Sequence, residues 1–82
     1  MNFVKAVQAL TDAEASGVPH LRAVRALEKA GFLVAREGAK HIVMAKGGAF
    51  VTIPRHDPVN AYTMGGIIRD AGLSVEEFRK LL

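Results

Sequence analysis

The sequence contains no cysteine, which excludes both a disulfide framework and a thiolate metal site. Its three histidines, His20, His41 and His56, lack the spacing of zinc ligands, and the sequence offers no cluster of carboxylates for another metal ion. We therefore expect a protein that works without a metal or any other cofactor.

Long apolar runs are absent as well. No stretch approaches the roughly 20 residues that a membrane-spanning helix requires. Gln8 interrupts the short apolar patch near the N-terminus, which argues against a signal peptide. The apolar fraction of 50% is nevertheless too high for a disordered chain. These features predict one small cytoplasmic domain with no membrane partner.

Acidic residues are scarce in the middle of the chain. Between residues 15 and 69, three acidic residues stand against eight basic ones, namely Arg22, Arg25, Lys29, Arg36, Lys40, Lys46, Arg55 and Arg69. A basic middle favours a polyanionic partner, with nucleic acid first. A charged coat that keeps the protein soluble explains the same composition equally well.

The first 17 residues are expected to be an N-terminal helical extension or leader. Residues 2–10 carry apolar side chains at helical spacing, and Thr11-Asp12-Ala13-Glu14 has the form of a capping box. Ser16-Gly17-Val18-Pro19 then breaks the pattern. We place the domain itself at residues 18–82.

A helix is predicted from Pro19 to Gly31, because proline suits a first helical turn and glycine commonly ends a helix. Its apolar stripe is expected to consist of Leu21, Ala23, Val24, Ala26, Leu27 and Ala30. The basic side chains on the opposite side are Arg22, Arg25 and Lys29. They form either an RNA-facing stripe or a solvated helix face.

Three short strands should follow, at residues 32–35, 40–46 and 49–54, with Gly47-Gly48 as a two-residue hairpin turn. Alternation predicts one set of side chains facing the core: Ile42, Met44, Val51 and Ile53. The opposite set is His41, Val43, Ala45, Phe50 and Thr52. Pro54 marks the end or the edge of the last strand.

Residues 56–60 have the composition of a loop. Thr63 is expected to cap a helix that runs to about Ala71 and is terminated at Gly72. This start puts Gly65-Gly66 in the first turn, where free N–H groups can meet a phosphate or the glycines can permit close packing. Ser74-Val75-Glu76-Glu77 is a second capping box, which opens a last helix through Leu82.

The order of these elements predicts an α+β fold, with helices packed on one face of a small three-stranded antiparallel sheet. The other face is left open and carries His41, Phe50 and Thr52. Phe50 then either stacks on a base or is covered by the N-terminal segment.

Several fragments, taken in order, resemble a known family. They are Gly31-Phe32, Ala39-Lys40-His41-Ile42-Val43-Met44, Val51-Thr52-Ile53-Pro54-Arg55-His56, Thr63 through Ser74, and Glu77-Phe78. Their order and spacing resemble the HicA toxins of HicA–HicB toxin–antitoxin pairs over roughly residues 20–82. The family's Gly-Ser before the histidine is Ala39-Lys40 here. Where the family has a glycine before the helix threonine, this sequence has Tyr62. After that threonine the family commonly has a basic residue, and Gly65-Gly66 occupies those positions here.

The resemblance implies a double-stranded-RNA-binding-domain-like fold of the order α-β-β-β-α. It also implies a ribosome-independent mRNA interferase that acts on RNA and is inhibited by a HicB-like antitoxin covering the active site. The family's catalytic histidine falls on His41.

Imidazole titrates near neutral pH, so His41 is expected to serve as a general base in RNA cleavage. Lys40 and Arg55 are candidate phosphate contacts, and Arg36 and Lys46 are candidate RNA contacts beside them. His56 is the candidate complementary acid, if its loop folds back on the sheet. The alternatives are that His41 is an exposed strand histidine without a task and that His56 only starts a loop.

His20, beside Pro19, is expected to be a surface residue. Two further functions also fit the chain. One is a catalytically silent RNA-binding module on the same fold. The other is a protein-interaction module that docks a partner or a second copy through the open sheet face or the N-terminal segment.

Overall fold

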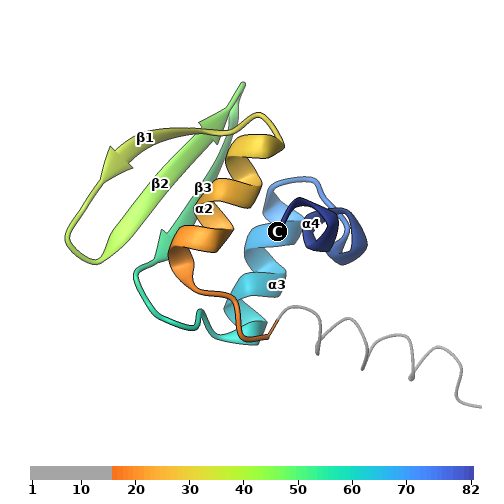
Figure 1. Ribbon diagram of the computed structural model, residues 1–82. Coiled ribbons are helices and arrows are strands. Elements are labelled where there is room, and N and C mark those ends of the chain that lie inside the picture. Colours follow the sequence, from red (N-terminus) through yellow and green to blue (C-terminus); the bar gives the residue numbers. More distant parts are fainter. Residues whose placement is uncertain (1–15) are drawn as a thin grey trace, which may run out of the picture.

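The computed structural model describes residues 16–82 (Figure 1). The elements are α2 (His20–Lys29), β1 (Leu33–Glu37), β2 (His41–Lys46), β3 (Ala49–Pro54), α3 (Ala61–Asp70) and α4 (Val75–Leu81). This order confirms the predicted α+β class and its similarity to the double-stranded-RNA-binding fold. The helix expected at residues 2–10 and the capping box at 11–14 lie outside the described residues.

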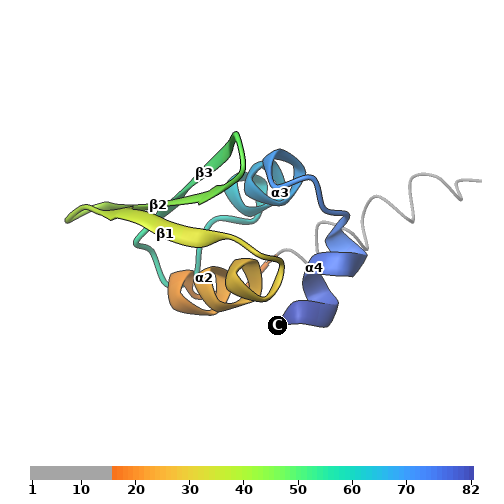
Figure 2. The same cartoon turned by 90° about the horizontal axis from the view of Figure 1, so that it is seen from above.

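The three strands form one antiparallel sheet in the order β1-β2-β3, so β2 is central. The predicted alternation is confirmed, because Ile42, Met44, Val51 and Ile53 are all buried. Helices α2 and α3 lie on the side of the sheet that these residues face (Figure 1), and α4 lies beyond them, away from the strands (Figure 2). No helix within residues 16–82 covers the opposite face of the sheet, which we call the open face (Figure 2).

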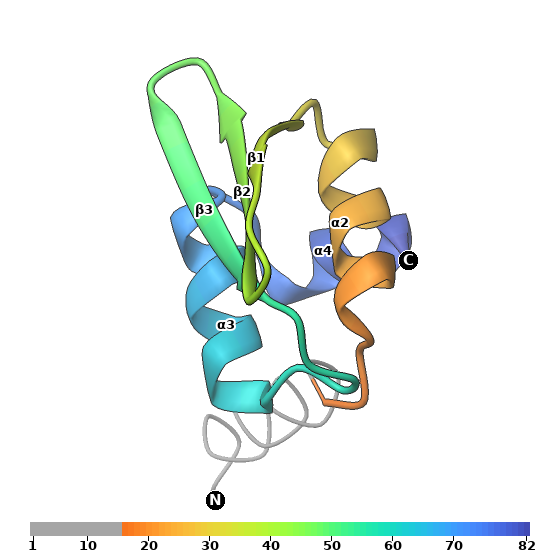
Figure 3. The same ribbon diagram turned by 90° about the vertical axis from the view of Figure 1, so that its left-hand side faces the viewer.

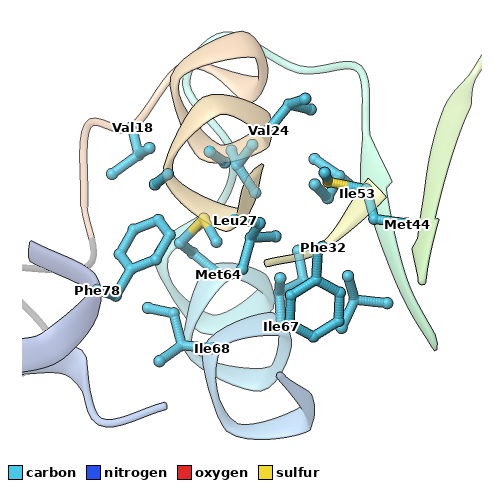
Figure 4. Packing of buried hydrophobic residues seen from close by; sticks show 14 of the residues in the cluster. Val18, Val24, Leu27, Phe32, Met44, Ile53, Met64, Ile67, Ile68 and Phe78 are labelled. Carbon is cyan, nitrogen blue, oxygen red and sulfur yellow. The ribbon is translucent and has the colours of Figure 1, made fainter. Parts of the chain in front are cut away.

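The buried side chains of the described residues are all apolar and form a single cluster between the sheet and the helices (Figure 4). Figure 4 labels Val18, Val24, Leu27, Phe32, Met44, Ile53, Met64, Ile67, Ile68 and Phe78. A core of this size holds a small domain together mainly by removing apolar surface from water. None of the helices in residues 16–82 has the length and apolar character needed to cross a membrane.

Both predicted glycine stops are confirmed. Gly31 has φ 101° and is followed by Phe32, whose N–H bonds the Leu27 carbonyl at 2.9 Å. This is a Schellman ending, in which the residue after the glycine packs against the last helical turn. It explains why Phe32 is buried in the core and β1 begins one residue later than predicted.

The apolar stripe of α2 was predicted with one wrong member. Leu21 is 53% exposed, whereas Ala23, Val24 and Leu27 are buried. Each residue turns a helix by about 100°, so Leu21 lies about 160° around the helix from Ala23, on the outer side. The stripe is narrower than a count of apolar residues indicates.

Helix α3 begins earlier than predicted, and its cap is Asn60 rather than Thr63. The Asn60 Oδ1 atom accepts hydrogen bonds from the N–H groups of Tyr62 at 2.9 Å and Thr63 at 3.2 Å. Both residue types cap helices well, and here Asn60 satisfies two free N–H groups at once. Gly65-Gly66 therefore lies in the second turn.

The other local signals agree with the structure. Residues 47–48 form the hairpin turn, with positive φ at Gly47 alone, a pattern that fits a type II′ turn. Ser74 and Glu77 form the predicted capping box at the start of α4. Val18 pairs with Val59 in an isolated bridge, and the division of the chain at residue 18 stays a prediction.

Candidate active site

His41 is the first residue of β2, on the open face of the sheet. Its carbonyl accepts the Gly38 N–H at 2.8 Å, and the neighbouring Lys40 carbonyl accepts the Arg55 N–H at 2.9 Å. A side chain at position 38 would bring a Cβ within 3.3 Å of the His41 carbonyl, so Gly38 permits this close turn. The backbone on both sides of His41 is thus held, while its side chain remains exposed.

An open cleft of about 770 Å³ brings His41 and His56 to one site. Its other lining residues are Thr52, Pro54, Pro58, Asn60 and Thr63. The β3–α3 loop therefore places His56 on a cleft shared with His41, as the sequence analysis required for a complementary acid. Two imidazoles on one cleft can accept a proton from one atom of a substrate and donate a proton to another.

A second depression, of about 460 Å³, meets the first at His41 and Thr52. Arg36 and Lys40 line it, and among the described residues neither side chain has a hydrogen bond or ion pair. The structure therefore brings two of the predicted RNA contacts next to the histidine, with their charges available to a ligand.

A β-bulge puts Arg36 on this face. Val34 pairs with Met44 and Arg36 with Val43, so Ala35 is the extra residue. Without the bulge Arg36 would share the face of Val34, toward the helices. One extra residue reverses the alternation and re-aims the side chain. The predicted strand ended at Ala35, so the sequence analysis missed this effect.

Two other predicted RNA contacts are engaged elsewhere. The Arg55 guanidinium donates from Nε to the Gly38 carbonyl at 2.9 Å and lies 3.6 Å from the Glu37 carboxylate. Lys46 Nζ donates to the Ala30 carbonyl at 2.7 Å and lies 5.9 Å from the centre of the Phe32 ring. Arg55 thus braces the turn before His41, and Lys46 closes the end of α2, about 17 Å along β2 from His41.

His20 is not the free surface residue that was expected. Its Nδ1 lies 2.6 Å from the Asp57 Oδ1, and its side chain is 13% exposed. The backbone N–H of His20 also donates to Asp57 Oδ1, at 3.0 Å. This backbone hydrogen bond is the main reason that the pKa of Asp57 lies below its ordinary value; the hydrogen bond from the His20 side chain lowers it further.

The Gly65-Gly66 pair does not offer free backbone N–H groups. In the second turn of α3 these groups are bonded within the helix. Close packing does not explain the pair either, because a Cβ at Gly65 would meet no atom within 4 Å. A Cβ at Gly66 would be 3.8 Å from Arg69, an ordinary contact. The structure gives no packing reason for these two glycines.

Three polar residues of the cleft are not among the predicted site residues. The sequence places Thr52 on the open face without a role, Asn60 in a loop and Thr63 at a helix cap, whereas in the structure all three line the cleft. The only sequence signal for their meeting is that β3 ends and α3 begins within a few residues of His56. Among residues 16–82, no group of three or more His, Asp or Glu side chains is arranged to hold a metal ion.

The open face also carries exposed apolar side chains, away from the histidines. Leu33, Ala45 and Phe50 form one row across the three strands, because Leu33 pairs with Ala45 and Ala45 with Phe50. Leu33 is 72% exposed and Phe50 is 63% exposed. The N-terminal segment, which the alternative has covering Phe50, lies outside the described residues. The face is thus apolar at one end and basic at the other.

Comparison with protein families identified a related family. The family model described as the HicA toxin of bacterial toxin–antitoxin systems matches residues 22–73, which include β1, β2, β3, α3 and both cleft histidines. Searches of curated proteins and of solved structures returned no match.

Proposed function

The chain belongs to the HicA family of toxins from bacterial toxin–antitoxin systems, and from that membership and the cleft we propose that it is an mRNA interferase. The proposed enzyme cleaves RNA by histidine acid–base catalysis, with His41 as the general base. One observation carries the proposal: His41 and His56 line one open cleft, next to a depression lined by Arg36 and Lys40.

In the proposed reaction His41 takes the proton of a ribose 2′-hydroxyl, and the 2′-oxygen attacks the adjacent phosphorus. The bond from phosphorus to the 5′-oxygen breaks, and protonated His56 gives its proton to that leaving oxygen. The products are a 2′,3′-cyclic phosphate and a 5′-hydroxyl. Acid–base catalysis of this kind typically contributes about 10²- to 10⁴-fold to a rate.

Positive charge near the phosphate supports the same chemistry, because the transition state concentrates negative charge on the phosphate oxygens. Arg36 and Lys40 stand on the depression beside His41 without other bonds among the described residues. Lys40 occupies the position of the family's serine, so a cation replaces a hydroxyl next to the catalytic residue. We assign both cations to phosphate binding, and Arg55 to bracing the turn that holds His41.

The test is cleavage of an unstructured RNA by the purified protein in the presence of a chelator. Parent protein should cleave it, His41→Ala should lose at least about 100-fold in rate, and Glu28→Ala, changed on the exposed side of α2, should behave as the parent. Circular dichroism should verify that all three are folded. Equal cleavage by the parent and His41→Ala would refute the role of His41.

A partner is also proposed, namely a HicB-like antitoxin that covers the open face. The apolar row of Leu33, Ala45 and Phe50 supports a protein surface here, since exposed apolar residues next to a polar rim typically mark interaction sites. Phe50→Glu should abolish co-purification with an antitoxin encoded beside the gene and leave RNA cleavage intact.

Two other outcomes would favour the alternative functions. If the parent binds RNA without cutting it, the protein is a silent RNA-binding module. A homo-oligomer measured by light scattering, and disrupted by Phe50→Glu, would support self-association.

A further inference from the structure

His20 and Asp57 join the start of α2 to the loop between β3 and α3. Asp57 Oδ1 accepts the His20 backbone N–H at 3.0 Å and lies 2.6 Å from His20 Nδ1. Figure 3 shows this loop beside the segment that enters α2. Because the two residues are 37 positions apart in the sequence, this is a tertiary contact between two separate parts of the fold.

The contact meets a need of α2. The first N–H groups of a helix have no partners within it and usually bond a capping side chain. Pro19 stands at the cap position and provides no such bond. Asp57 supplies the missing acceptor, and its negative charge is favourable at a helix N-terminus. The carboxylate is therefore held at a defined place.

The β3–α3 loop is fixed by backbone bonds at its two ends. The Arg55 N–H donates to the Lys40 carbonyl at 2.9 Å, and the Val59 N–H donates to the Val18 carbonyl at 2.8 Å. Residues 56–58 between these anchors are exposed. Among the described residues, Asp57 provides the side-chain hydrogen bonds that tie this part of the loop to α2. His56 directly precedes Asp57, so the direction of the His56 backbone depends on that tie.

We propose that His20 is a positioning residue of the cleft. By fixing Asp57, it holds His56 in place on the cleft that His56 shares with His41. The effect on cleavage rests on the proposed function, whereas the effect on the loop does not. His20 precedes the residues that the family model matches, 22–73, so this brace joins that segment to the part of the chain before it. His56 is also close enough for its charge to lower the pKa of Asp57 slightly, after the stronger effects of His20.

The first test needs no RNA. Hydrogen exchange of backbone amides is compared by NMR in the parent, His20→Ala, His20→Asn and the control Glu28→Ala. We expect the Val59 and His56 amides to exchange about tenfold faster in His20→Ala, while core amides such as that of Met44 keep the parent rate. His20→Asn should restore slow exchange, because its amide nitrogen stands where Nδ1 stands and can donate to Asp57.

The second test uses RNA cleavage. His20→Ala should lower kcat about tenfold with KM within about twofold, since small displacements of catalytic groups slow the chemical step more than binding. His20→Asn should recover most of the rate. A double variant of His20→Ala with Asp57→Ala should be no slower than Asp57→Ala alone, as expected if His20 acts through Asp57.

The outcomes separate this proposal from the proposed function. If the parent fails to cleave RNA, the nuclease assignment fails, and the exchange experiment still decides whether His20 fixes the loop. Positioning is overturned if His20→Ala accelerates exchange equally across the core, which indicates a general loss of stability. It is also overturned if His20→Asn does not restore the parent exchange rates.

Discussion

The two ends of strand β2 differ in what their cationic side chains contact. At the His41 end, Arg36 and Lys40 have no bonds within the described residues and line a depression. At the other end, Lys46 donates to the carbonyl of Ala30, the C-cap of α2, and lies over the Phe32 ring. The same residue types therefore serve a candidate ligand at one end and the fold at the other. The number of charges along a sequence does not distinguish a cation that binds a ligand from one that stabilises the fold. The hydrogen-bond partners of each side chain in the structure do distinguish them.

The largest effect that this comparison predicts concerns RNA affinity. In an inactive His41→Ala background, changing Arg36 and Lys40 together to Gln should weaken binding of a single-stranded RNA about 100-fold, because each charged contact is worth roughly tenfold. The same change at Lys46 should weaken it less than about threefold. Fluorescence anisotropy over a range of salt measures both, and the salt slope should drop by roughly 1.4 for the double change. Equal losses at both ends of β2 would contradict the comparison.

A smaller effect is expected at the Lys46 end of β2, where a substitution should lower the stability of the fold rather than the affinity for RNA. Lys46→Met keeps the apolar stem beside Phe32 but loses the bond to the Ala30 carbonyl and the charge at the helix C-terminus, which together stabilise by about 1 kcal/mol. Tm should fall by about 4–8 °C. Lys40→Met is the matched control and should leave Tm unchanged. A comparable fall in the control would show that Lys40 also stabilises the fold.

The fold was predictable because its main signals are local. Alternation placed Ile42 and Met44 in the core, and glycine marked the ends of α2 and α3, since both depend on a few consecutive residues. The predicted start of α3 was wrong because Asn60 and Thr63, three residues apart, are both residue types that cap helices well. The sequence does not reveal which of them meets the free N–H groups.

The site was predictable only in part. The motif around His41 predicts the histidine of the candidate site, and the basic middle predicts an anionic ligand. Three features of the site join residues 15 or more positions apart. They are the cleft shared by His41 and His56, the hydrogen bond from Arg55 to the Gly38 carbonyl, and the His20–Asp57 contact. The direction of Arg36 depends on a bulge opposite β2. Such features follow from how the elements pack, which a local pattern does not specify.

The corrected start of α3 gives a further prediction. With the helix beginning at Ala61, Gly65 is an interior helical position with open space where a Cβ would stand. Gly65→Ala should therefore stabilise the protein by about 0.5–1 kcal/mol, because alanine loses less backbone freedom on folding and favours the helix. Gly66→Ala, whose Cβ makes an ordinary contact with Arg69, should give a similar gain. Unchanged Tm in both variants would argue against a helix that includes this pair from its second turn.

The smallest expected effects depend on pH. They contrast Asp57, in the loop that carries His56, with Glu77, in the capping box of α4. The pKa of Asp57 lies below its ordinary value of 3.8, mainly because of the His20 backbone hydrogen bond. That of Glu77 lies below its ordinary value of 4.5, mainly because of the Ser74 backbone hydrogen bond. A lowered pKa in the folded state means that the ionised form stabilises the fold. This contribution is complete above the pKa of the unfolded chain and is lost as the pH falls through the folded pKa.

The free energy of unfolding, measured by urea titration, should therefore decline as the pH is lowered from about 5 toward 3. Asp57→Asn and Glu77→Gln should each make that decline shallower, because each removes one carboxylate that must be protonated on acidification. The two variants should differ at the cleft. Lowering the pH should reduce the protection of the Val59 amide, that is, its exchange rate relative to the intrinsic rate at the same pH, through Asp57. Glu77→Gln should keep that loss of protection, and Asp57→Asn should remove its dependence on pH. A decline in stability that neither variant alters would mean that these two carboxylates do not contribute to the acid sensitivity of the fold.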